Sequence, residues 1–293
     1  MPLPAVGGRR VPVLVRHLIL RPLFRVLIAG CLSLAAGAHA ADVLGLPDFN
    51  TYMQGKYVYE RHCRVCHGVR GDGNGEMSPS LQPRPRSFRE GLFKFRTTPF
   101  GTLPTVDDLR HTIRHGLAGT GMGMFTQLPD DDLQAVIAYV QSFSRRWRKP
   151  ENYAEPMPLP APPEWFEDAP RKAAQAAVGR GLFLQHCATC HGPEADGRGP
   201  AAAMLRDVWN QPAKPSDLRE PHLRCGSRPE DLYRLLATGM NGTPMISFET
   251  LLTPEQRWTI VAWIFSQKRA EAPTLGVAPP RELPASAPKD GPR

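Results

Sequence analysis

Apolar positions recur with a helical period near the end of each half of the chain. In residues 133–140 and 258–265, apolar side chains fall at i, i+3, i+4 and i+7, which predicts one amphipathic helix in each segment. A further set at Leu232, Leu235 and Leu236 predicts a middle helix in the second half. No segment sustains the alternation of a half-buried strand, so the sequence predicts an all-α fold. The apolar positions of the two final helices are Leu133, Val136, Ile137, Val140, Trp258, Val261, Ala262 and Phe265.

Capping residues mark where two of these helices begin. Thr253 and Gln256 form a capping box, in which each side chain bonds the other residue's backbone N–H, and Pro254 takes the first helical position. Ser227 and Glu230 offer a similar capping box for the middle helix. Both patterns support the helical interpretation.

Residues 1–40 have the pattern of an export signal. Arginines come first, residues 26–36 are apolar, and Ala38 and Ala40 supply a small-x-small cleavage site. We therefore predict a secretory signal peptide that is cleaved after Ala40. Two alternatives are an uncleaved membrane anchor and a lipoprotein signal at Cys31.

The charge of the chain is concentrated in that same segment. The formal net charge is +8, but five of these charges are arginines of residues 1–40, and the rest of the chain holds 31 basic and 28 acidic residues. This near balance argues against a nucleic-acid partner. The longest later apolar run, Ile260 to Phe265, is far shorter than the ~20 residues that a membrane-spanning helix needs.

Four of the six cysteines lie in two Cys-x-x-Cys-His motifs. This motif is typical of covalent attachment of c-type haem, in which two thiols bond one porphyrin and the adjacent histidine ligates the iron. The alternatives are disulfides, a four-cysteine zinc site and a thioredoxin-like redox pair. The motifs lie 124 residues apart, too far for a usual zinc site, and no βαβ pattern surrounds either one. The motif residues are Cys63, Cys66, His67, Cys187, Cys190 and His191.

The two halves repeat each other beyond these motifs. Glycine and aromatic positions match at an offset of 124 residues, a glycine-rich loop follows each motif, and two methionines match at an offset of 123. The repeat predicts two tandem modules, residues 41–147 and 173–270. A proline-rich linker at 148–172 would join them, and a disordered tail would follow at 271–293. The matching pairs include Gly55 with Gly179, Tyr59 with Phe183, Met122 with Met245 and Tyr139 with Trp263.

The repeat also selects candidates for the second axial ligand of each iron. An iron held by one histidine takes a sixth ligand or keeps an open position. Met122 and Met245 hold the same repeat position in loops that contain Gly or Pro, and we predict that they ligate the two irons. Met124 is the alternative in the first module and Met240 in the second. The other histidines considered as distal ligands are His111, His115 and His222.

Together, the haem motifs, the later methionine loops and the aromatic-bearing final helices resemble class I cytochromes c. The tandem arrangement is similar to the periplasmic dihaem cytochromes c of bacteria, over roughly residues 50–145 and 173–268. The resemblance implies two all-α domains, each of which wraps a few helices around one covalent haem c. It also implies that the first and last helices of each domain cross with aromatic contacts. The pairs expected to meet are Tyr59 with Tyr139 and Phe183 with Trp263.

The function that this resemblance implies is electron transfer in the periplasm, between redox protein partners that act as donor and acceptor, without enzymatic activity. One alternative is an electron-transfer subunit fixed in a larger oxidoreductase complex. Another is a dihaem peroxidase, in which His111 or His115 would serve at a haem with an open distal position.

Overall fold

The computed structural model describes residues 47–270, so the predictions for the signal peptide and the tail lie outside the described residues. The described part is helical, with two isolated β-bridges and no strand, which confirms the all-α prediction. None of its helices is long and apolar enough to cross a bilayer. The α-helices are α3 (Phe49–His62), α4 (Arg64–His67), α5 (Val106–His115), α6 (Asp130–Ser142), α7 (Ala169–His186), α8 (Ala188–His191), α9 (Pro229–Thr238) and α10 (Pro254–Ser266). The short 3-10 helices are η1 (Ser78–Ser80), η2 (Arg145–Arg148), η3 (Pro150–Asn152) and η4 (Glu164–Phe166).

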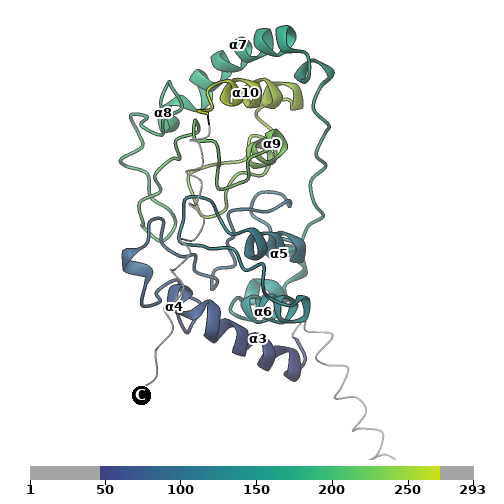
Figure 1. Cartoon of the computed structure of the whole chain (residues 1–293), viewed down its shortest axis with the longest axis vertical. Coiled ribbons are helices and arrows are strands. Elements are labelled where there is room, and N and C mark those ends of the chain that lie inside the picture. Colours follow the sequence, from purple (N-terminus) through teal and green to yellow (C-terminus); the bar gives the residue numbers. More distant parts are fainter. Residues whose placement is uncertain (1–46, 271–293) are drawn as a thin grey trace, which may run out of the picture.

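These helices form two similar modules stacked along the long axis of the molecule (Figure 1). The first module holds α3 to α6 and the second holds α7 to α10. Helices α3 and α6 lie at one end of the stack, α7 and α10 lie at the other, and α5 and α9 face the middle. Each module has its own cluster of buried apolar side chains.

In each module the first and last helices cross at a glycine. A Cβ at Gly55 of α3 would overlap the backbone oxygen of Ala135 in α6, and a Cβ at Gly179 of α7 would overlap that of Thr259 in α10. Only glycine lets the two helix backbones approach this closely. The aromatic contacts expected beside the crossings are present. The ring centroids are 5.3 Å apart for Tyr59 and Tyr139, and 4.3 Å apart for Phe183 and Trp263.

One of the two predicted helix starts is confirmed and the other is shifted by one residue. Helix α10 begins with the predicted capping box, in which the Gln256 amide donates to Thr253 Oγ1 at 3.2 Å. Helix α9 is capped by Arg228, whose amide donates to an Asp231 carboxylate oxygen at 3.1 Å, and not by Ser227. The shift places Pro229 at the first helical position, where its missing N–H has no bond to lose.

The proline-rich linker packs on both modules. Trp147 before it is buried in the first core, while Trp165 and Phe166 are buried in the second. Helix α7 already begins at Ala169, inside the segment that we expected to be linker. Between these anchors the chain runs extended along one side of the stack, and the Met157 amide donates to the Thr97 oxygen at 2.8 Å.

Buried polar contacts join the two modules directly. The Arg96 guanidinium is 4% exposed and donates to the backbone oxygens of Thr238 at 2.7 Å and Gly239 at 3.3 Å. Asn241, 1% exposed, accepts from the Gly101 amide at 2.8 Å and donates to the Thr102 oxygen at 2.9 Å. Side chains from both modules thus satisfy backbone groups of the other, which fixes how the modules face each other.

The close approach of α7 and α10 at Gly179 leads to a testable prediction, for which Gly181 in the same helix provides the control variant. Gly179→Ala should destabilise the protein by about 1–3 kcal/mol, because the added methyl group forces α7 away from α10. Gly181→Ala lies in the same helix with nothing within 4 Å of its Cβ, and should be neutral or stabilising by up to ~1 kcal/mol. Thermal unfolding of the two variants should separate them by several degrees. Equal melting temperatures would show that the crossing is not tightly packed.

Candidate haem sites

The predicted site residues of both modules line one continuous cavity of about 610 Å³. Its walls are mostly apolar, as expected for a site that takes a large, flat, mainly hydrophobic group. From the first module it is lined by Cys63, Cys66, His67 and Met122, and from the second by Cys187, Cys190, His191 and Met245.

Each Cys-x-x-Cys-His motif forms one short helical turn against a glycine-rich loop. The first cysteine caps the preceding long helix, and α4 or α8 follows it. The Gly75 amide donates to the Cys66 oxygen at 3.1 Å, and the Gly199 amide donates to the Cys190 oxygen at 3.2 Å. A Cβ at either glycine would overlap the backbone of the motif, so these loops hold the turn by close backbone contact.

His67 is held in the orientation that an iron ligand needs. Its Nδ1 lies 3.0 Å from the Arg86 backbone oxygen, and its ring stacks on Phe88 with centroids 4.4 Å apart. Because a carbonyl oxygen only accepts, Nδ1 carries the proton and Nε2 keeps its lone pair. Burial also lowers the pKa of His67, which favours the neutral imidazole that binds metals.

His191 holds the equivalent position in the second module, but within the described part of the chain its Nδ1 makes no hydrogen bond like that of His67. The backbone of Ser216 lies beside it and raises its pKa, but burial lowers the pKa more. The contact does not reach hydrogen-bond geometry, so His191 Nδ1 is buried without a partner among the described residues. A ring nitrogen in this state is costly to bury, and a small shift toward Ser216 would satisfy it.

The two methionine loops have the same local structure. The Met122 amide donates to Thr120 Oγ1 at 3.1 Å, and the Met245 amide donates to Thr243 Oγ1 at 3.2 Å. Of the rivals, Met124 is 69% exposed and is not among the cavity-lining residues. Met240 does line the cavity, next to Met245.

The two histidines of α5 and Cys225 differ in whether they line the cavity. His111 and His115 stack on each other on the exposed face of α5, with centroids 4.3 Å apart, and do not line the cavity. Neither therefore stands where a peroxidase would need it. Cys225 does line the cavity, and burial raises the pKa of its thiol to about 12, which makes it an unreactive wall residue.

The structure also bears on the alternative uses of the cysteines. Within residues 47–270, all five cysteines are free thiols, and no three metal-ligating side chains gather in one cluster. A zinc site built from both motifs therefore has no support in the described part of the chain. The chemistry of each site instead fits haem, since two thiols, a neutral imidazole and a thioether surround an apolar space.

Two contacts of the first site escaped the sequence analysis, namely the Arg86 carbonyl and the Phe88 ring beside His67. A backbone carbonyl leaves no trace in side-chain identity. The internal repeat could have indicated these residues, because Phe88 and Leu218 occupy equivalent positions. The Phe88 amide donates a hydrogen bond to the Gly71 oxygen at 2.7 Å, and the Leu218 amide donates one to the Ala195 oxygen at 2.8 Å. The offset there is 130 residues, six more than at the haem motifs, and a search at a fixed offset misses it.

The fold and these sites define a c-type cytochrome with covalently bound haem c. Residues 50–140 and 174–264 each match the family model described as cytochrome c oxidase, cbb3-type, subunit III, and the chain belongs to this family. Among solved structures, it is similar to a chain of the reducing HAO-like protein complex of Kuenenia stuttgartiensis. The two are 33% identical with a TM-score of 0.65, and the match covers 76% of this chain and 97% of the other.

Proposed function

We propose that this protein is a periplasmic dihaem cytochrome c that carries single electrons between two redox protein partners and is not an enzyme. Export would follow cleavage after Ala40. The observation that carries the proposal is the single cavity lined by two repeat-related sets of haem-binding residues, each with a histidine and a methionine. Cys63 and Cys66 bind the first haem, and Cys187 and Cys190 bind the second.

The ligand set suits electron transfer. Haem supplies an iron that alternates between Fe(III) and Fe(II) by one electron. His67 and His191 hold one axial position of each iron, and Met122 and Met245 fill the other, so no position stays open for a substrate. A thioether ligand and an apolar cavity both disfavour the extra charge of Fe(III), which raises the reduction potential.

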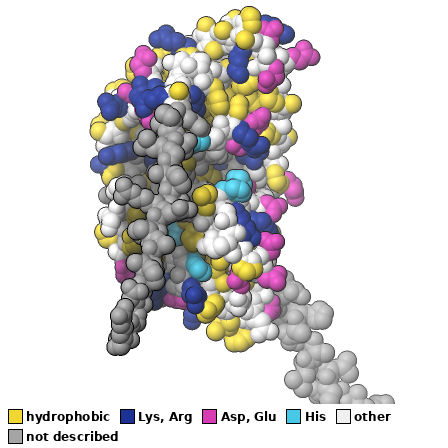
Figure 2. Space-filling model, viewed as in Figure 1, with side chains coloured by type: hydrophobic (Ala, Val, Ile, Leu, Met, Phe, Trp, Pro, Cys, Tyr) yellow, Lys and Arg dark blue, Asp and Glu magenta, His cyan; other side chains and the backbone are white. Residues whose placement is uncertain are grey.

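The charges of the modules support two different docking partners. Residues 41–150 carry 15 basic and 11 acidic side chains, whereas residues 151–293 carry 16 and 17. Figure 2 shows side chains of both signs interspersed over the visible face, without one dominant patch. In this proposal the more basic first module meets one partner and the second module meets the other.

A second candidate function is that of an electron-transfer subunit fixed in a larger oxidoreductase complex. The observation that favours it is the similarity to a chain of a reducing HAO-like protein complex. The redox chemistry would be the same. Purification from the native source under mild conditions separates the two, because a free carrier migrates at the mass of one chain.

The ligand assignment predicts opposite outcomes for two neighbouring methionines. Met122→Leu should remove the first haem's share of the sulfur-to-iron absorption band and lower that haem's potential, because the thioether is lost. Met124→Leu should change neither, since Met124 is exposed and does not line the cavity. Loss of the band in Met124→Leu with retention in Met122→Leu would reverse the assignment.

The proposed function predicts two one-electron waves in a spectroelectrochemical titration of the purified protein, with low-spin spectra throughout. Both irons are then six-coordinate, and peroxide should not be turned over. A high-spin haem in the resting protein, together with peroxide turnover, would contradict an electron carrier and favour a peroxidase.

A further inference from the structure

The cavity that joins the two haem sites is lined by cations and by no carboxylate. Among the described residues that form its wall there is no Asp or Glu. Charges of one sign on the wall of an apolar cavity repel one another, and those that are partly buried lose hydration, so an anion among them would stabilise them. The cations are Arg84, Arg86, Lys94, Lys214 and Arg224.

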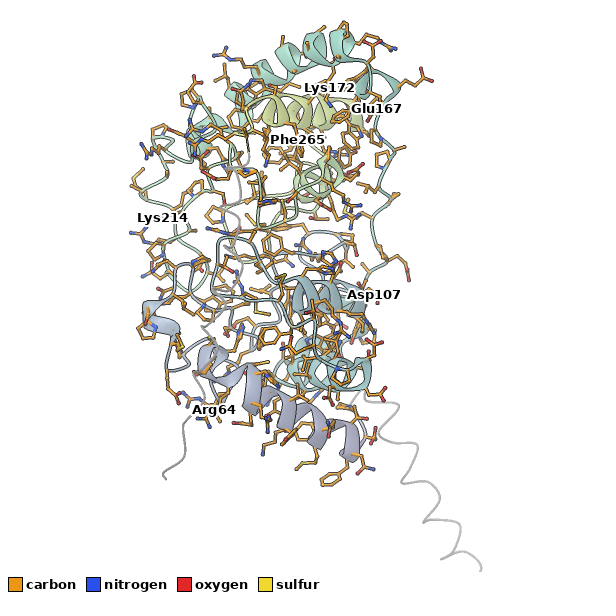
Figure 3. All side chains as sticks on the ribbon, in the orientation of Figure 1. Arg64, Asp107, Glu167, Lys172, Lys214 and Phe265 are labelled. Atoms are coloured by element: carbon orange, nitrogen blue, oxygen red, sulfur yellow. The ribbon has the colours of Figure 1, made fainter. Side chains whose placement is uncertain are left out.

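Four of these cations follow the repeat. At the 130-residue offset that pairs Phe88 with Leu218, Arg84 matches Lys214 and Lys94 matches Arg224. Arg84 and Lys214 are exposed, and Figure 3 shows Lys214 near the level at which the modules meet. Lys94 and Arg224 are half-buried. Each module thus contributes one outer and one inner cation to the same cavity.

The inner cations act on one another across the module boundary. Burial, and then the charges of Arg86 and Arg224, lower the pKa of Lys94 to about 8. Burial also lowers the pKa of Arg224. Asp207, which is not part of the wall, is the one acid that acts on Lys94. Glu90, also outside the wall, acts on Arg86 together with Asp207. Two carboxylates outside the cavity still leave the five cations with excess positive charge.

Arg86 completes the group and reaches from the first module to the second. Its guanidinium lies over the Trp209 ring, with 4.2 Å between its carbon and the ring centroid. Its Nη1 is buried and has no hydrogen-bond partner among the described residues. Such a donor costs free energy unless an acceptor meets it, and Arg86 lines the cavity from which an acceptor could come.

We propose that these five cations bind the propionate carboxylates of both haems and gather them at the boundary between the modules. This rests on the proposed function, which places one haem in each module. Each haem brings two propionates, so four carboxylates would face five cations. Lys94 and Arg224 are the central pair, because they come from equivalent positions of the two modules and line the same cavity.

In this arrangement, the reduction potential of each haem depends on charged residues of the other module. A cation that pairs with propionates offsets their negative charge, which otherwise stabilises Fe(III). Loss of either inner cation therefore lowers the potentials of both haems, whereas a cation bound to one haem alone would affect one.

The test compares Lys94→Met and Arg224→Met with Lys56→Met, a matched loss of charge on the exposed surface of α3. In titrations at fixed pH and ionic strength, each cavity variant should shift both waves downward, by about tenfold in the equilibrium constant, or ~59 mV for a one-electron couple. Lys56→Met should leave both waves close to those of the parent protein, and Lys94→Arg, which keeps the positive charge, should also leave them close to the parent values.

A second measurement is the infrared difference spectrum, recorded for the intact parent protein and for each variant with the haem propionates isotopically labelled. Their carboxylate bands should shift in Lys94→Met and Arg224→Met and stay unchanged in Lys56→Met. Equal shifts of potential in all three variants, or unmoved propionate bands, would overturn the proposal. Potentials that respond to exchange of chloride for phosphate, with unmoved bands, would assign the cluster to a free anion instead. A protein without haem would overturn the proposed function itself.

Discussion

The structure depends on the burial of apolar side chains against a group that the chain itself does not supply. In each module, side chains of the apolar core also line the cavity, among them Phe88, Ile137 and Leu236. The hydrophobic effect stabilises such an arrangement only when the space is filled. Haem fills it, and its covalent attachment to two cysteines of one helical turn places the iron beside a fixed histidine. Fold and function therefore rest on the same contact.

The helices provide the frame around that contact. Glycines at the two crossings let α3 approach α6 and α7 approach α10, and this sets the distance between each haem-binding turn and the final helix that lines the cavity. Arg96 and Asn241 then fix the two frames against each other through buried hydrogen bonds. The cavity is continuous across this boundary, so in our proposal its cations act on both haems.

Much of this was predictable from the sequence, for identifiable reasons. Side-chain identity determines the haem motifs, and the 3.6-residue period determines the final helices, so both could be found directly. The capping box at Thr253 was found in the same way. The start of α9 was missed by one residue because Pro229 competes with Ser227 for the helix terminus. The anchoring of the linker by Trp165 was missed because a local proline count says nothing about distant packing. The cation group was missed because the repeat shifts from an offset of 124 to 130 residues between the motif and the cavity wall.

The most direct test of the account is the intact mass of the exported protein, made in cells that mature c-type cytochromes. The account predicts one coloured species whose mass exceeds that of the polypeptide by two haems, and by one haem when Cys187 and Cys190 are both replaced by serine. A colourless product at the mass of the bare polypeptide would contradict it.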